Sequence, residues 1–219
     1  MAKYALPNGS TVSIAKTMAA ALPFTAATNA SQCVLTVTAA TVKANDIVII
    51  ESTWLGLNNL VARVAQATAT AITLENVDTS DTADFPAGGG TGTIRVVSAW
   101  QQVPLITNVA TAGGEQQTTA VQFLEWNDQV ELDTFKTAVS QTYTLAHDAF
   151  DPIRPIFEGL DKSKAVVPVY FYQKRLGEQR YYAATVSFQK VPATAMNEVE
   201  TVQVIFRLRS EMKIYAVKP

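Results

Sequence analysis

The side chains best suited to chemistry in this 219-residue chain are one histidine and one cysteine. A Ser–His–Asp triad would have to use His147, yet the chain has no Gly-x-Ser-x-Gly sequence of the kind that carries the nucleophile in many hydrolases. Cys33 lies in the apolar segment Cys33–Thr38, where a small buried side chain is expected rather than a nucleophile. A hydrolase is therefore disfavoured.

Two further segments contain residue types that bind ligands. Asp78, Asp81 and Asp84 follow one another at three-residue steps, whereas calcium loops place their ligands at every second position. Gly88–Gly92 lacks the lysine of a phosphate loop and is expected to open a strand, not a helix. The aspartate segment is interpreted as a solvated turn, with a weak cation site as the alternative. The glycine segment is interpreted as a flexible hairpin loop. No catalytic, cofactor or metal residue is predicted.

The composition favours a large core and a weakly charged surface. Hydrophobic residues make up 48% of the chain, charged residues only 16%, and the net charge is −2. This suits a protein that is covered by copies of itself and, equally, a β-protein that is simply rich in Thr and Ala. The absence of a Lys/Arg run disfavours tight nucleic-acid binding. The single cysteine excludes an intrachain disulfide and a cysteine-based zinc site. We expect no signal peptide, because the apolar stretch Met18–Phe24 is short, is interrupted by Pro23 and lacks a charged start. We also expect no transmembrane helix, because no run approaches about 20 apolar residues.

The last quarter of the chain predicts long antiparallel strands. One face of Tyr181–Gln189 holds Tyr182, Ala184, Val186 and Phe188; the other holds Thr185, Ser187 and Gln189. Thr201–Arg209 repeats this alternation, with Val202, Val204, Phe206 and Leu208 inward and Gln203, Arg207 and Arg209 outward. A period of two indicates a sheet with one buried face and one that faces water or a partner.

The first half of the chain has a different pattern of short strands separated by polar turns. The expected strands are Cys33–Thr38, Ile47–Glu51, Leu60–Ala65, Ala71–Glu75 and Thr93–Val97. This spacing predicts a small barrel-like β-module, inserted at residues 26–99 into a main domain formed by residues 1–25 and 100–219. The segment before the module is expected to be an arm or edge strand, centred on Thr11–Ala15.

One helix is predicted, from Asp148 to Gly159. Pro152 suits its first turn and Gly159 its end. Before it, Thr111–Gln117 is expected to be a flexible loop and Thr137–Leu145 a strand. The fold class is therefore mainly β: an antiparallel β-sandwich with one flanking helix and the inserted module. Long strands without catalytic groups favour a building block over an enzyme.

Three parts of the chain together resemble the major tail tube proteins of long, flexible-tailed bacteriophages. They are Met1–Gly9, the run Tyr143–Leu160, and the closing strands Tyr181–Gln189 and Val202–Arg209. The module, with Ile72–Thr79 and Asp84–Pro86, is similar to one in a branch of that family. The resemblance implies six-membered rings that stack into a tube in the virion tail. It also implies transient passage of double-stranded DNA, and contacts with tape measure, tail terminator and distal tail proteins. No membrane contact is implied.

Two alternatives stay open: a tail terminator or neck protein, and a monomeric carbohydrate-binding module in which Trp54 or Trp100 stacks on a sugar. Trp54 and Trp100 are otherwise expected in the core.

The expected subunit contacts lie in loops and strand ends. The interface residues predicted are Thr111, Gly113, Gly114, Glu115, Gln116, Pro192, Thr194, Met196, Lys174, Arg175 and Arg180. Together with Lys162 and Lys164, the last three form a basic group that lies in ordinary solvated turns or meets Asp128, Glu131 and Asp133 of another subunit. The residues expected to face the lumen are Gln203, Arg207, Thr185 and Ser187.

Overall fold

The computed structural model describes residue 4 and residues 6–217, which form fifteen β-strands and one helix. The first strands are β1 (Thr11–Met18), β2 (Leu22–Ala27), β3 (Val34–Val37), β4 (Ile47–Ser52), β5 (Val61–Ala67), β6 (Ala71–Leu74) and β7 (Gly92–Val103). The next are β8 (Ile106–Ala112), β9 (Gln116–Val121), β10 (Val130–Lys136) and β11 (Ser140–Ala146), followed by helix α1 (Arg154–Ser163). The last are β12 (Val166–Gln173), β13 (Glu178–Ala193), β14 (Thr201–Leu208) and β15 (Lys213–Ala216).

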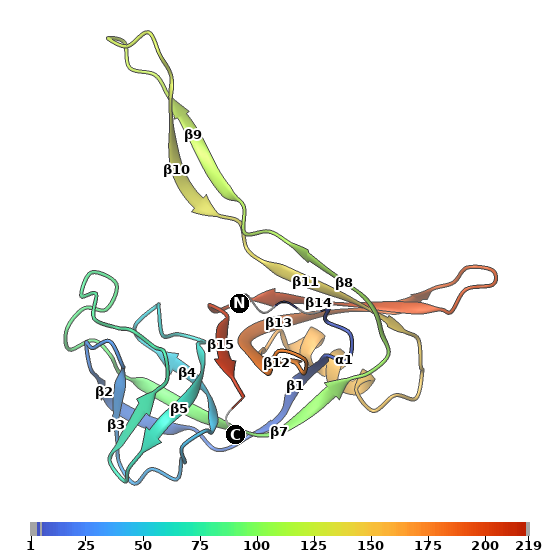
Figure 1. The fold of residues 1–219 in the computed structure, drawn as a ribbon, viewed down its shortest axis with the longest axis horizontal. Coiled ribbons are helices and arrows are strands. Elements are labelled where there is room, and N and C mark those ends of the chain that lie inside the picture. The colour runs from blue at the N-terminus through green and yellow to red at the C-terminus, as the bar shows by residue number, and fades with distance from the viewer. Residues whose placement is uncertain (1–3, 5, 218–219) are drawn as a thin grey trace.

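The main body is one antiparallel sheet in the order β7-β1-β12-β13-β14-β11-β8, with β15 on an edge of β13 (Figure 1). Its alternating apolar side chains share one core, in which Ile14 of β1, Tyr143 of β11 and Phe206 of β14 are all buried. Phe157 of α1 packs into the same core. The mainly β fold with one short flanking helix is confirmed.

The module is a ring of six strands, five of them short and the sixth, β7, 12 residues long. The order is β2-β3-β6-β5-β4-β7, and a further pairing of β2 with β7 returns the path to its start. A second core, separate from that of the body, fills it, with Phe24, Leu35 and Ile72 fully buried. The barrel-like module is therefore present, and β7 runs from it into the main sheet.

Two expectations about elements were wrong. β1 is not an edge strand, because it pairs with β7 on one side and β12 on the other, and Val12 and Ile14 are buried. The helix begins later than expected, since the Asp151 carboxylate accepts a hydrogen bond from the Ile153 amide in the turn before it. Gly159 lies inside the helix, which ends at Lys164 in the left-handed conformation.

Two segments project from the body (Figure 1). The longer is the hairpin of β9 and β10, whose strands form a separate two-stranded sheet. The shorter is the connection between β13 and β14. Among the described residues, no helix has the length and apolar character needed to cross a membrane.

Candidate assembly surfaces

The β9–β10 hairpin, here called the arm (residues 113–139), continues the β8–β11 ladder beyond a kink. Ala112 pairs with Ser140 below the kink and Gln116 with Lys136 above it, so each strand contributes three intervening residues. Gly113 and Gly114 have φ values of +87° and +84° there. The expected loop at Thr111–Gln117 is thus a bend inside one long hairpin, and the chain reverses further on, between Val121 and Val130.

The arm has one apolar and one acidic face. Val121 pairs with Val130 and Thr119 with Leu132 on one face, while Glu131 and Asp133 lie on the other. The arm tip, defined as residues 122–129, exposes Phe123, Leu124 and Trp126 at 50%, 100% and 53%. An isolated two-stranded ribbon is at most marginally stable in water. The arm therefore presents apolar surface that no described residue covers.

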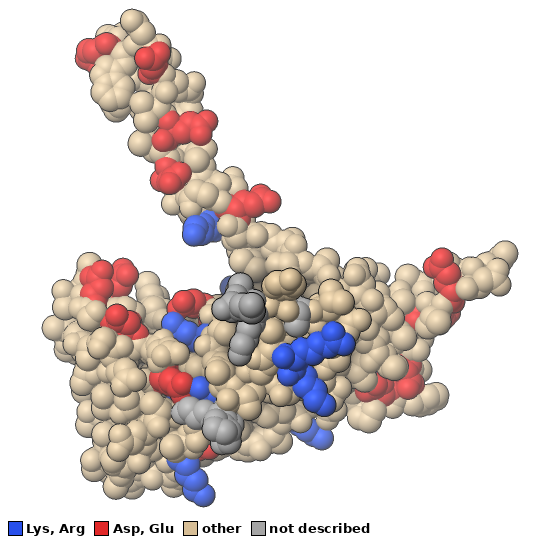
Figure 2. Space-filling view, in the orientation of Figure 1, with Lys and Arg blue, Asp and Glu red and all other residues tan. Residues whose placement is uncertain are grey.

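Charge is unevenly divided between the projections and the body. The arm carries five acidic residues and one basic residue, and the β13–β14 connection carries Glu198 and Glu200. Sixteen of the 17 basic side chains and twelve of the 19 acidic ones lie elsewhere, so the remainder is net positive by four. Figure 2 shows acidic side chains along both projections and basic ones over the body between them. This asymmetry favours contacts between the projections of one copy and the body of another.

The predicted basic group is only partly available for such contacts. Lys174 and Arg175 are exposed and make no ion pair with any residue that the structure describes. Arg180 instead pairs with Glu178 and lies over the Phe171 ring, and Lys164 pairs with Asp161. Together with Lys162, which is also exposed and has no ion pair with a described residue, Lys174 and Arg175 are therefore the best candidates in this group for a partner's carboxylates.

The predicted residues of the β13–β14 connection lie at its exposed tip or its base. Met196 is 91% exposed, Thr194 donates a hydrogen bond to Glu200, and Pro192 is half-buried at the end of β13. Val191 and Val199 add further exposed apolar surface, at 73% and 71%. This second projection therefore also presents uncovered apolar surface.

The outer face of β13, β14, β11 and β8 is polar and nearly uncharged. Registered side chains form three rows across the four strands: Gln189, Gln203, Thr144 and Asn108; Ser187, Ile205, Thr142 and Ala110; Thr185, Arg207, Ser140 and Ala112. The alternate residues, such as Tyr143 and Phe206, point into the core. Arg207 is the single charged side chain in these rows.

Of the predicted lumen residues, Gln203 and Arg207 are exposed and Ser187 is half-buried on this face. Thr185 is on the same face but only 8% exposed. The reason is that the module covers the neighbouring part of β13, where Ala183 and Tyr181 pack against Ile49 and Val61. Even in the single chain, therefore, almost none of the Thr185 side chain is exposed to a lumen.

Residues 52–217, three quarters of the chain, match the family described as phage tail tube protein, TTP. The chain belongs to the phage tail tube protein family. It is accordingly a structural protein of the virion tail, which assembles with other tail proteins and is not an enzyme. The resemblance seen in the sequence is confirmed.

Comparison with curated proteins finds no match. Among solved structures, this tail tube protein is similar to a chain in the six-fold symmetrised cryo-EM structure of the anti-feeding prophage (AFP) baseplate. The identity is 12%, the alignment covers 56% of this chain and 88% of that one, and the TM-score is 0.37. This likeness is too distant to carry an argument about the present chain.

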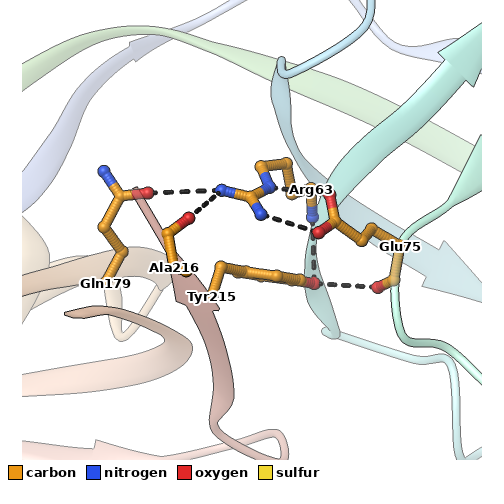
Figure 3. Close-up of polar contacts among 5 residues, drawn as sticks. All are labelled: Arg63, Glu75, Gln179, Tyr215 and Ala216. Atoms are coloured by element: carbon orange, nitrogen blue, oxygen red, sulfur yellow. Dashed lines mark hydrogen bonds and ion pairs between the residues drawn. The ribbon is translucent and has the colours of Figure 1, made fainter. Parts of the chain in front are cut away.

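A buried polar network holds the module of this tail tube protein against the body (Figure 3). Arg63 of β5 forms a bidentate ion pair with Glu75, in which the Nε–Oε2 distance is 2.8 Å and the Nη2–Oε1 distance is 2.7 Å. Its Nη1 donates to the Ala216 carbonyl at 2.9 Å. The Tyr215 hydroxyl accepts a hydrogen bond from the Arg63 amide and donates to the Glu75 carbonyl, both at 3.1 Å. Strand β15 thereby ties the module to the end of the main sheet.

Electrostatics and burial both support this network. The hydrogen bonds to Glu75 raise the pKa of Arg63, while burial raises the pKa of the Tyr215 hydroxyl. This contact was not predicted from the sequence. The signal available was an arginine in the otherwise apolar strand Leu60–Ala65, because an arginine in a buried strand requires an ion-pair partner.

The residues first considered for chemistry have structural roles. Burial raises the pKa of the Cys33 thiol, which keeps it protonated and unreactive. His147 contacts Arg154 at the start of α1, and Asp78 accepts hydrogen bonds from Ser80 within its turn. Trp54 is 3% exposed and donates to the Pro86 carbonyl. Within the described residues, no group of His, Cys, Asp and Glu side chains is placed to hold a metal.

Proposed function

We propose that this protein forms stacked rings of six subunits, and that the outer face of β13, β14, β11 and β8 lines a channel for double-stranded DNA. The single observation that supports this best is the composition of that face. Its three rows contain amides, hydroxyls and two alanines, with one isoleucine and one arginine. Each phosphate held by a basic side chain adds affinity, so a face with few cations lets DNA pass without holding it.

The free edge of the main sheet supports lateral assembly. β8 ends the strand order, and no described strand pairs with its outer edge. An unpaired edge invites a strand from another chain, and natural monomers usually protect such edges. In the proposed ring, the neighbouring subunit covers β8 and extends the polar face around the channel.

The two projections support contacts beyond one subunit's own body. Both carry exposed apolar residues and an excess of carboxylates, while the body is net positive. In the proposed tube they lie on neighbouring copies, where Glu131 and Asp133 of the arm meet Lys174 and Arg175. Such charge pairs set register and orientation more than affinity.

Negative-stain electron microscopy of the concentrated protein, together with a light-scattering mass, tests this proposal. We expect hollow rings and tubes with a central channel, and a mass that is a multiple of six subunits. Filaments without a channel, or closed rings of another subunit number, contradict it.

A further inference from the structure

The module and the body enclose a groove on the side where the arm begins. It has a volume of about 890 Å³, and its apolar lining includes Leu55 and Phe85 from the module and Val139, Leu208 and Met212 from the body. Leu55 is 88% exposed at its rim. The module thus supplies one wall of the groove, and the other wall consists of Leu208–Met212 together with Val139 at the base of the arm.

We infer that the groove receives the arm tip of a second copy of this chain. This inference rests on the proposed tube and assigns one of its contacts. The tip presents Phe123, Leu124 and Trp126, with the Phe123 and Trp126 rings packed edge to face at 5.2 Å. Aromatic side chains that enter an apolar pocket are the residue types that dominate interface energies.

Charge agrees with this occupant. Glu125 and Asp128 flank the tip, and Arg209 in the groove is exposed and has no ion pair with any described residue. The two carboxylates in the groove already have partners: Glu211 pairs with Lys213, and Asp78 accepts two hydrogen bonds from Ser80. Arg209 is therefore the one lining charge still without a partner among the described residues.

The geometry excludes the chain's own tip as occupant. The groove contains Val139 at the arm base, whereas the arm projects away from the body (Figure 1). Ten residues separate Gly114 at the kink from Leu124, which is roughly 30 Å of extended strand. A tip that enters the groove of another copy makes a head-to-tail contact between different surfaces. Such a contact repeats without closing unless its rotation closes a ring, so it suits the growth of a tube.

The test mixes two single-cysteine variants, Leu124→Cys and Leu55→Cys, under assembly conditions with mild oxidation. Each variant alone has no second cysteine at the contact, and the native Cys33 is fully buried. A disulfide forms only when the two Cα atoms lie within about 7 Å. We expect disulfide-linked dimers in the mixture and none in either variant alone. The matched control pairs Leu124→Cys with Lys43→Cys, at an exposed position outside the groove.

The inference is overturned if the mixture forms tubes without a disulfide between positions 55 and 124. It is also overturned if the control pair crosslinks equally well. Both outcomes leave the tube proposal intact. Failure of the unsubstituted protein to form tubes contradicts the proposed function instead.

If the cysteine variants do not assemble, charge-reversal variants test the contact between the arm tip and the groove. Arg209→Glu is expected to raise the concentration needed for assembly roughly ten-fold, about 1.4 kcal/mol. Combining it with Glu125→Lys and Asp128→Lys restores assembly. Absence of this rescue overturns the inference.

Discussion

The guanidinium of Arg63, on strand β5 of the module, lies 4.5 Å from the ring centroid of Tyr215 on the C-terminal strand β15. The two residues are 152 positions apart, and the Tyr215 hydroxyl also bonds the Arg63 amide. The end of the chain thus helps to fix the position of a module formed near its beginning.

Arg63→Met is expected to destabilise the protein by about 3 kcal/mol, because it leaves the Glu75 carboxylate without its buried ion-pair partner. Tyr215→Phe keeps the ring but loses the hydroxyl bonds, so about 1 to 2 kcal/mol is expected. Urea unfolding followed by circular dichroism measures both. The double variant Arg63→Met/Glu75→Gln should recover part of the loss, and equal stability of Arg63→Met and the parent protein would refute this role.

Stability is expected to fall as pH rises above about 10, the ordinary pKa of tyrosine. Burial raises the pKa values of Tyr143, Tyr181, Tyr182 and Tyr215. The folded chain therefore keeps these protons at a pH where the unfolded chain releases them, so alkali favours unfolding. The measurement is Tm between about pH 8 and pH 11. A smaller decline in Tyr143→Phe supports the assignment, whereas a constant Tm argues against it.

Gly113→Ala is expected to disturb the arm more than Gly114→Ala. Both positions have positive φ, which penalises any residue with a Cβ. A Cβ at Gly113 would lie 2.0 Å from the Ala138 carbonyl oxygen, whereas at Gly114 the nearest atom is Val139 Cγ2 at 3.4 Å. The readouts are the unfolding free energy and the yield of tubes. Equal effects of the two substitutions would show that the close approach to Ala138 is unimportant.

Replacing the arm residues 116–136 by a short Gly-Asn turn should leave a folded monomer that does not form tubes. The arm forms its own two-stranded sheet, and its residues contribute nothing to the buried core clusters. Circular dichroism and Tm check the fold, and electron microscopy checks assembly. If this variant forms normal tubes, the arm is not required for assembly.

The sequence predicted the strands whose apolar residues alternate cleanly. Val202, Val204 and Phe206 point into the core as expected, and so do Tyr182 and Val186. The short strands of the module were also recovered, because polar turns separate them. Local periodicity was sufficient in these places.

The failures involve contacts between distant segments. β1 was expected at an edge because nothing in its sequence indicates that β12, about 150 residues later, covers its second side. Thr185 looked exposed because the alternation cannot show that the module packs beside it. The kink at Gly113 was interpreted as a loop, since a glycine pair indicates positive φ but not the strand pairing that resumes beyond it.

The most direct test of the central proposal places a label on the polar face. Gln203→Cys, at an exposed position on β14, is assembled into tubes, reacted with a small maleimide-linked gold cluster, and imaged by cryo-electron microscopy. We predict gold density inside the channel, together with protection of the same cysteine from a large maleimide polymer in tubes but not in monomers. Gold on the outer surface of the tube would contradict a channel lined by β13, β14, β11 and β8.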